Sequence, residues 1–165
     1  MNTTVESPVK VERRDGVWIV RLDRPKANVI DAAMTDALCR VFVEARETAG
    51  LKVIVLSHSG PHFSFGASVQ EHLPETVAGM LRGFHRLFRA IAASGVPVLA
   101  AVRGQCLGGG LELASFCTRL FAAPDAKLGQ PEIVLGVFAP VASLVLPERI
   151  GRAAAEDLCL SGRSV

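Results

Sequence analysis

The sequence lacks a marked excess of charge of either sign. Its 165 residues include 18 Lys and Arg against 16 Asp and Glu, which gives a net charge of +2 at pH 7. Nucleic-acid-binding and membrane-surface proteins usually carry a concentrated basic patch, so neither class is indicated. Every apolar run is also interrupted by Arg, Glu, Gly or Pro well short of the length that crosses a bilayer. We therefore expect neither nucleic acid nor a membrane as a partner.

The sequence also lacks paired cysteines and a convincing set of metal ligands. Its four cysteines are irregularly spaced, and no secretory segment opens the chain, so we expect reduced thiols and a cytoplasmic location. His58 and His62 are four residues apart, but one ends a predicted strand and the other lies in a proline-containing loop. No third ligand has suitable spacing, and we expect no metal site.

Two familiar glycine motifs are missing as well. The triple glycine at 108–110 is followed by Leu111 and Glu112, not by the Lys-Ser/Thr of a phosphate-binding loop, and its spacing is not that of a dinucleotide fingerprint. A carboxylate at this position would repel phosphate. Ser64 and Ser68 flank a loop glycine, but no G-x-S-x-G motif surrounds either, which argues against a serine nucleophile.

What is present fits one α/β domain spanning residues 1–165. Half of the residues are apolar and 21% are charged, the balance of a globular protein, and no repeat is visible. Asp15-Gly16 predicts a hairpin turn between strands. Strands are expected at 9–14, 17–23, 52–57, 97–102 and 119–123, and helices at 32–48 (capped by Asp31), 75–93, from about 109, at 139–149 and at 153–160. Strands that alternate with helices indicate crossover connections. The chain stops in a loop after the last helix, so we expect a truncation.

The triple glycine lies between a buried strand and an apolar helix. The first turn of such a helix has free backbone N–H groups and the positive end of the helix dipole, which suit a negatively charged oxygen. Glycines also allow a helix and a strand to pack closely, and from these residues alone packing is slightly the better explanation. Both interpretations stay open at this point.

Two carboxylates stand in apolar surroundings. Glu112 follows Gly110 by two residues inside the apolar helix, and Glu132 lies between a strand and another apolar run. Burial raises the pKa of a carboxyl group and tunes it for proton transfer near neutral pH. A simpler role for Glu112 is a first-turn acid, stabilised by ~0.3–1 kcal/mol through the helix dipole. If Ala67 faces Gly109, their two N–H groups can converge on one oxygen.

Three motifs in this order resemble the crotonase superfamily, the enoyl-CoA hydratase/isomerase family. They are FSFGA at 63–67, GQCLGGGLELA at 104–114 and LGQPEI at 128–133. The resemblance covers essentially the whole chain. It implies a spiral of ββα units, assembled as trimers or pairs of trimers, and here lacking the C-terminal helical segment of family members.

The resemblance also implies roles for particular residues. Ala67 and Gly109 match the oxyanion-hole donors, and Glu112 and Glu132 match the two hydratase glutamates, with Glu132 nearest the α-carbon and Glu112 holding the water. Coenzyme A would be part of the substrate, and no separate cofactor is implied. Stretches that touch coenzyme A in relatives match Lys26, Ala27, Ser68, Val69 and Gln70.

Two departures narrow the resemblance. Ser68 stands where most enoyl-CoA hydratases have Asp, and GVFAPVAS at 136–143 replaces a turn rich in Gly and Pro. Both variants resemble the cyclohexadienoyl-CoA hydratases of aromatic degradation, which implies a lyase acting on a cyclic dienoyl-CoA. A Δ-isomerase, a hydratase of linear enoyl-CoA and an inactive fragment that binds acyl-CoA or serves assembly remain alternatives.

Overall fold

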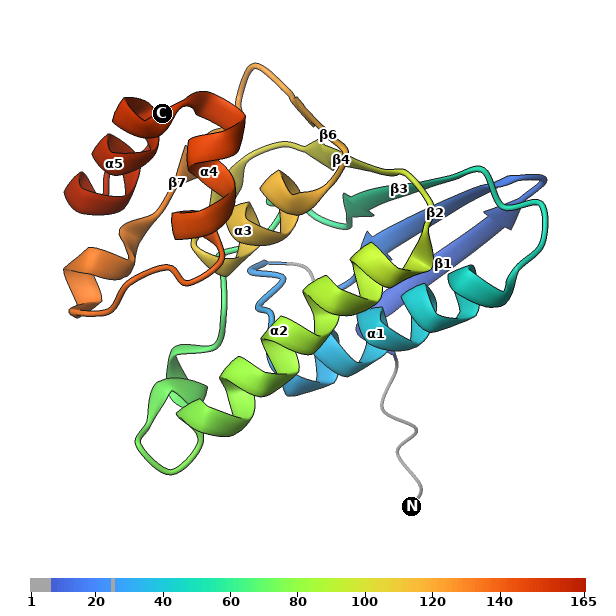
Figure 1. Cartoon of the computed structure of the whole chain (residues 1–165), viewed down its shortest axis with the longest axis horizontal. Helices are drawn as coiled ribbons and strands as arrows, with labels where there is room; N and C mark the ends of the chain where they lie inside the picture. The colour runs from blue at the N-terminus through green and yellow to red at the C-terminus, as the bar shows by residue number, and fades with distance from the viewer. Residues whose placement is uncertain (1–6, 25) are drawn as a thin grey trace.

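The fold is built on a five-stranded mixed sheet, seen in a computed structural model that describes residues 7–24 and 26–165 (Figure 1). The strand order is β1-β2-β3-β4-β6, with β1 antiparallel to β2 and all other pairs parallel. The strands are β1 (Val9–Arg14), β2 (Val17–Leu22), β3 (Val53–His58), β4 (Val98–Val102) and β6 (Arg119–Ala122).

The hairpin between β1 and β2 turns at the predicted glycine. Gly16 has φ +68°, the left-handed conformation that this turn needs. Along β2, Trp18 and Val20 are buried while Val17, Ile19 and Arg21 are only half-buried, as their alternation predicts. Of the turn predicted at 24–28, Pro25 lies outside the described residues.

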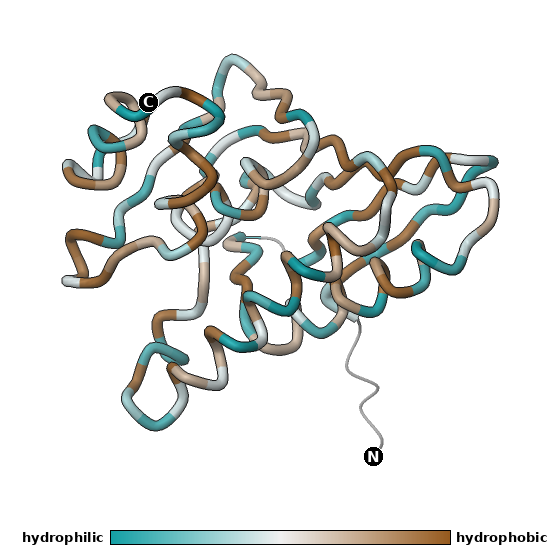
Figure 2. Tube along the Cα trace, in the orientation of Figure 1, coloured by the Kyte–Doolittle hydropathy of each residue, from teal (hydrophilic) through white to brown (hydrophobic). Residues whose placement is uncertain are grey.

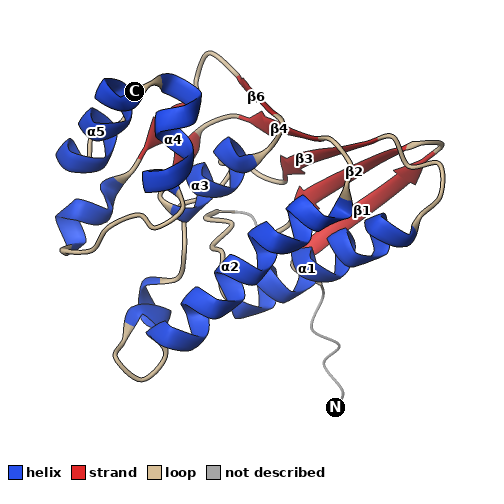
Figure 3. Cartoon of the chain, viewed as in Figure 1, coloured by secondary structure: helices blue, strands red, loops and turns tan. Residues whose placement is uncertain are grey.

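Two helices lie side by side against one face of this sheet (Figure 3). They are α1 (Ala32–Glu47), capped by the Asp31 side chain, and α2 (Val77–Ser94), which ends at Gly95 with φ +67°. Hydrophobic residues recur along both helices (Figure 2), and most of the residues that each helix buries are apolar. Leu38 and Phe42 of α1 and Leu87 of α2 join the sheet residues in the main core. No helix among the described residues is long and apolar enough to span a bilayer.

A second, two-stranded sheet positions the glycine turn. Here β5 (Gln105–Leu107) pairs in parallel with β7 (Lys127–Gly129), and α3 (Gly109–Phe116) starts two residues after β5. Strand β5 was not predicted, because three residues are too few to show an alternating pattern. Two short 3-10 helices, η1 (Val69–His72) and η2 (Pro131–Leu135), complete this region.

The last two helices form a small core of their own. They are α4 (Ala142–Ile150) and α5 (Arg152–Ser161), and their shared cluster is made of Ala139, Ala142, Leu146, Ala155 and Leu158. The first of these helices begins at Ala142, three residues after its predicted start at about residue 139, and follows a turn in which the Ser143 amide donates to the Ala139 carbonyl (3.0 Å). At its start the backbone amides of Val141 and Ala142 donate to the side chain of Glu112.

Candidate active site

Ala67 is held by a parallel β-bridge to Ile30. The Ile30 amide donates to the Gly66 carbonyl (2.9 Å), and the Ser68 amide donates to the Ile30 carbonyl (3.3 Å). In such a bridge the neighbours of Ala67 make the hydrogen bonds, so its own N–H points to the opposite side. A second bridge, between Ser64 and Cys106, ties the same loop to β5.

The Ala67 and Gly109 amides lie side by side. A Cβ placed on Gly109 would be 3.1 Å from the Ala67 nitrogen, and one on Gly66 would be 3.2 Å from the Gly109 nitrogen. Neither N–H has an acceptor among the described residues. Gly66 has φ +99°, and its added Cβ would be only 2.9 Å from the Leu107 carbonyl oxygen, so this close approach requires glycine. Two free donors therefore adjoin at the start of α3.

Ser64 stabilises the loop that carries Ala67. Its hydroxyl is fully buried, donates to the Asn28 carbonyl (2.8 Å) and accepts from the Gly66 amide (3.0 Å). Asn28 in turn donates from its side chain to the carbonyls of Ser59 (3.1 Å) and His62 (2.9 Å). The serine is thus engaged in loop structure, in agreement with the argument against a serine nucleophile.

Glu112 is almost completely buried, with 2% of its surface exposed. Its Oε1 accepts hydrogen bonds from the amides of Val141 (2.7 Å) and Ala142 (2.8 Å) at the start of α4. Burial raises the pKa of Glu112, and these two hydrogen bonds act in the opposite direction because they stabilise the charged form. Oε2 has no protein partner in the described part of the chain and is available to a ligand.

Glu132 lies against the glycine turn. A Cβ placed on Gly108 would be 2.6 Å from Oε1 of Glu132, so the absence of a side chain at residue 108 makes room for this carboxylate. Burial, with the nearby charge of Glu112 adding to it, raises the pKa of Glu132 to about 7. Glu132 is therefore a carboxyl group that changes protonation near neutral pH.

Gln130 is a site residue that the sequence argument missed. It is fully buried, and with its amide nitrogen turned toward Glu132 it donates to both carboxylate oxygens, at 2.8 and 3.1 Å. The sequence shows a polar residue between a strand and the Pro131-Glu132 pair. If such a residue is buried, its side chain needs a hydrogen-bond partner, and this was the available signal.

The two amides and both carboxylates line one cavity of about 430 Å³. Most of the remaining wall is apolar, as suits the acyl part of a small ligand. It includes Phe65, Val77, Met80, Leu81, Phe84, Leu135 and Phe138, with His72 and His85 also at the wall. In this arrangement the two amides can polarise a carbonyl group, and the two nearby carboxyl groups can transfer protons to and from the same ligand.

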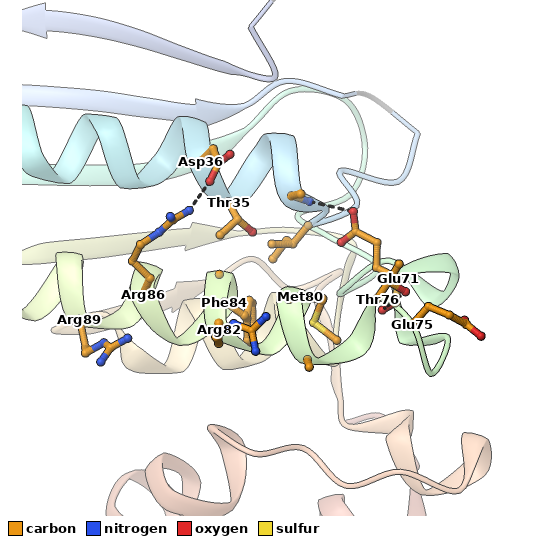
Figure 4. Close-up of a pocket in the computed structure, with 15 residues that line it drawn as sticks. Thr35, Asp36, Glu71, Glu75, Thr76, Met80, Arg82, Phe84, Arg86 and Arg89 are labelled. Atoms are coloured by element: carbon orange, nitrogen blue, oxygen red, sulfur yellow. Dashed lines mark hydrogen bonds and ion pairs between the residues drawn. The ribbon is translucent and has the colours of Figure 1, made fainter.

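A larger hollow of about 820 Å³ lies between α1 and α2 (Figure 4). Several of its charged groups already have partners. Arg86 forms an ion pair with Asp36, and the Glu71 carboxylate accepts from the backbone amide of Ala32. Met80 and Phe84 line both hollows, but neither glutamate of the smaller cavity reaches this one. The chemistry of the site therefore points to the smaller cavity.

Of the residues expected to touch coenzyme A, some lie at the cavity and others lie outside it. Val69 lines the cavity, while Lys26 and Gln70 are exposed outside it. The Ala27 carbonyl accepts from the Phe65 amide (2.9 Å), which brings this loop beside the one that carries Ala67, and Ser68 is buried. Among the described residues no three His, Cys, Asp or Glu side chains gather in a way that could hold a metal ion.

Residues 12–165 match the enoyl-CoA hydratase/isomerase family. The chain belongs to this family. It is 56% identical over 161 residues to a cyclohexa-1,5-dienecarbonyl-CoA hydratase of Thauera aromatica, which covers 96% of this chain and 62% of that protein. It is 37% identical to a probable enoyl-CoA hydratase of Mycobacterium bovis, again over 62% of that relative's length and 95% of this chain.

Solved structures of the enoyl-CoA hydratase/isomerase family agree with the fold. An enoyl-CoA hydratase of Mycobacterium smegmatis superposes with a TM-score of 0.91 at 28% identity, over 97% of this chain and 65% of that one. One from Thermoplasma volcanium gives 0.89 at 32% identity, over 96% and 66%. The predicted crotonase-like α/β fold is confirmed, and the chain spans about two thirds or less of the length of these relatives.

Proposed function

We propose that this chain adds water to an α,β-unsaturated coenzyme A thioester. The observation that carries the proposal is that two carboxylates, Glu112 and Glu132, line the same cavity as the unpaired amides of Ala67 and Gly109. Further support comes from the relative at 56% identity, which is named as a hydratase of a dienoyl-CoA thioester.

The two amides act on the thioester oxygen. As negative charge develops on this oxygen, the N–H groups of Ala67 and Gly109 donate to it, and the positive end of the α3 dipole adds to the stabilisation. Removing one such donor typically costs ~2.7–4 kcal/mol of transition-state stabilisation. As water adds to the β-carbon, the electrons of the C=C bond move toward the thioester carbonyl, and the resulting enolate oxygen is stabilised by the two N–H groups.

The two carboxyl groups divide the proton transfers. Glu112, whose Oε1 accepts from two amides at the start of α4, takes a proton from water as the water oxygen bonds to the β-carbon. Glu132, with a pKa of about 7, is partly protonated at neutral pH and gives its proton to the α-carbon of the enolate. The product has then gained a hydroxyl group at the β-carbon from water and a hydrogen at the α-carbon from Glu132. The proton that Glu112 took from water passes to Glu132, which restores both carboxyl groups.

We propose a cyclic dienoyl group as the acyl part. The apolar wall of a cavity of about 430 Å³ suits a compact ring, and the Thauera relative is named for such a substrate. Coenzyme A is part of the substrate, held by Lys26, Ala27 and the stretch 68–70, and no cofactor is required. A homo-oligomer, a trimer or a pair of trimers, in the cytoplasm completes the proposal.

Replacing Glu132 tests the function directly. We expect Glu132→Gln to lower kcat for hydration of a cyclic dienoyl-CoA by ~10²–10⁴-fold, because the variant cannot give up a proton. Binding of the CoA ester, measured by calorimetry, should change little. The matched control is Glu75→Gln, an exposed residue outside the catalytic cavity, which should keep full activity.

Product analysis in ¹⁸O-labelled water separates the hydratase from an isomerase. A hydratase places the label in the product and an isomerase does not. Turnover of Glu132→Gln at the rate of the unaltered chain, or product without label, would overturn the proposal.

A further inference from the structure

The geometry of Glu112 depends on a helix outside its own element. Both hydrogen bonds to Oε1 come from backbone amides at the start of α4, those of Val141 and Ala142. A shift of α4 by a fraction of its diameter would break these bonds and leave a buried carboxylate without donors, a costly state. The position of α4 against α3 therefore controls both the charge of Glu112 and the direction of Oε2.

Apolar packing alone does not fix that position. The buried apolar residues of α4, Ala142 and Leu146, belong to the small cluster that it shares with α5, and contact with the main core comes from Val141, which precedes the helix, and from the partly buried Val145. A helix pair with its own core can shift relative to its neighbours unless directional contacts hold it. Polar contacts between α4 and α3 add direction to this limited apolar contact.

Arg149 supplies such a contact at the far end of α4. Its Nη2 donates to the Cys117 carbonyl (2.7 Å) and its Nη1 to the Thr118 carbonyl (3.4 Å), at the C-terminal end of α3. A cation is favoured at this negative end of a helix dipole, and the planar guanidinium fixes the direction of both bonds. Thr118 is itself tied to the sheet, because its Oγ1 accepts from the Val98 amide (3.1 Å).

The two attachments work together. Glu112 joins the N-terminal ends of α3 and α4, and Arg149 joins their C-terminal ends, so the helices run side by side in the same direction. At a rise of 1.5 Å per residue the attachments are ~8–12 Å apart. One attachment alone would let α4 pivot about Glu112, whereas two prevent this rotation.

We propose that Arg149 is a positioning residue that keeps the start of α4 on the carboxylate of Glu112. The inference rests on the proposed function for its kinetic effect only, because the placement of Glu112 can also be measured without turnover. Nothing in the family motifs quoted above includes residue 149, which lies on the outer end of α4 and touches no part of the cavity.

Arg149→Gln tests the proposal against two matched variants. Arg149→Lys keeps the charge but not the paired geometry, and Arg152→Gln removes a nearby exposed arginine that pairs only with Glu156. We expect Arg149→Gln to lower kcat about tenfold with little change in KM, the size expected for a weakened hydrogen bond to a charged group. Arg149→Lys should recover part of the loss, and Arg152→Gln should behave as the unaltered chain.

A ¹³C NMR titration of labelled glutamate side chains, with Glu112 assigned from Glu112→Gln, gives the second readout. We expect the Glu112 titration to move to higher pH in Arg149→Gln, because lost donors disfavour the charged form. Four titratable groups share the cavity with this carboxyl or lie near it: Glu132 of η2, Cys159 of α5, His72 of η1 and His85 of α2. Glu132 is followed through the same glutamate label.

The outcomes separate the two proposals. If the unaltered chain shows no hydration, the proposed function fails, and the NMR titration alone decides the role of Arg149. If Arg149→Gln lowers the melting temperature but leaves kcat and the Glu112 titration unchanged, Arg149 only stabilises the fold and the inference is overturned.

Discussion

At residue 108 the space for a side chain is taken by a carboxylate of the site. A Cβ there would be 2.6 Å from Oε1 of Glu132, and the backbone has φ +50°. We expect Gly108→Ala to displace Glu132 and to abolish most of kcat. The backbone strain adds a loss of stability of about 1–3 kcal/mol. Steady-state kinetics and thermal melting measure the two effects.

Gly50→Ala is the matched control for this prediction. Gly50 also has a positive φ, +80°, but an added Cβ would meet nothing within 4 Å. The control should therefore lose stability to a similar degree and keep its activity. Equal loss of activity in both variants would show that strain, not contact with Glu132, is the cause.

Single residues differ in how far the sequence reveals them. Glu112 and Glu132 stand out in the sequence because burying a carboxylate in an apolar segment is costly. In the structure both line one cavity. Gln130 and Arg149 are harder to recognise in the sequence, because each contacts a partner that only the folded chain brings near. The contribution of a residue to a site is visible in advance only when its local surroundings are unusual.

At the scale of elements, Asp31 shows how a helix start is fixed. Its Oδ1 accepts from the Met34 amide (2.8 Å), and its other oxygen forms an ion pair with Arg24. We expect Asp31→Ala to lower the free energy of unfolding by about 1 kcal/mol, the usual cost of losing an N-cap. Urea denaturation measures the change, and Asp31→Asn, which keeps the capping oxygen, should lose less. An equal loss in both variants would assign the effect to the ion pair.

Long, regular elements were the predictable ones. The helices α1 and α2 and the hairpin of β1 and β2 lie within two residues of their predicted bounds, because each has a clear apolar period and a defined end. Strand β5, the two 3-10 helices and the start of α4 depend on contacts with distant segments. Helix α4 starts three residues after its predicted position, where the side chain of Glu112 accepts from the amides of Val141 and Ala142.

At the scale of the whole molecule, the buried carboxyl groups make stability depend on pH. The pKa of Glu132 is about 7 in the folded chain against an ordinary value of 4.5, so between these pH values the folded state binds more protons than the unfolded state. Stability from this group therefore falls as pH rises from about 4.5 to about 7. Burial lowers the pKa of His58, which has the opposite effect on stability as pH rises toward 6.5.

A comparison between variants isolates the contribution of Glu132. We expect Glu132→Gln to be more stable relative to the unaltered chain at pH 7.5 than at pH 5, by on the order of 1–3 kcal/mol. Urea denaturation at both pH values measures this difference, from which the effect of His58 cancels. A difference that does not change with pH would show that Glu132 ionises normally.

The amides of Ala67 and Gly109 come from segments that single β-bridges, not a long ladder, hold in place. The bridges from Ala67 to Ile30 and from Ser64 to Cys106 are each isolated. A bridge of one residue pair can open locally while the five-stranded sheet stays folded, and such an opening would separate the two donors. Opening of either bridge would shorten the time for which the two amides adjoin, and hydrogen exchange at the amides of Ser68 and Leu107 would report how often the bridges open.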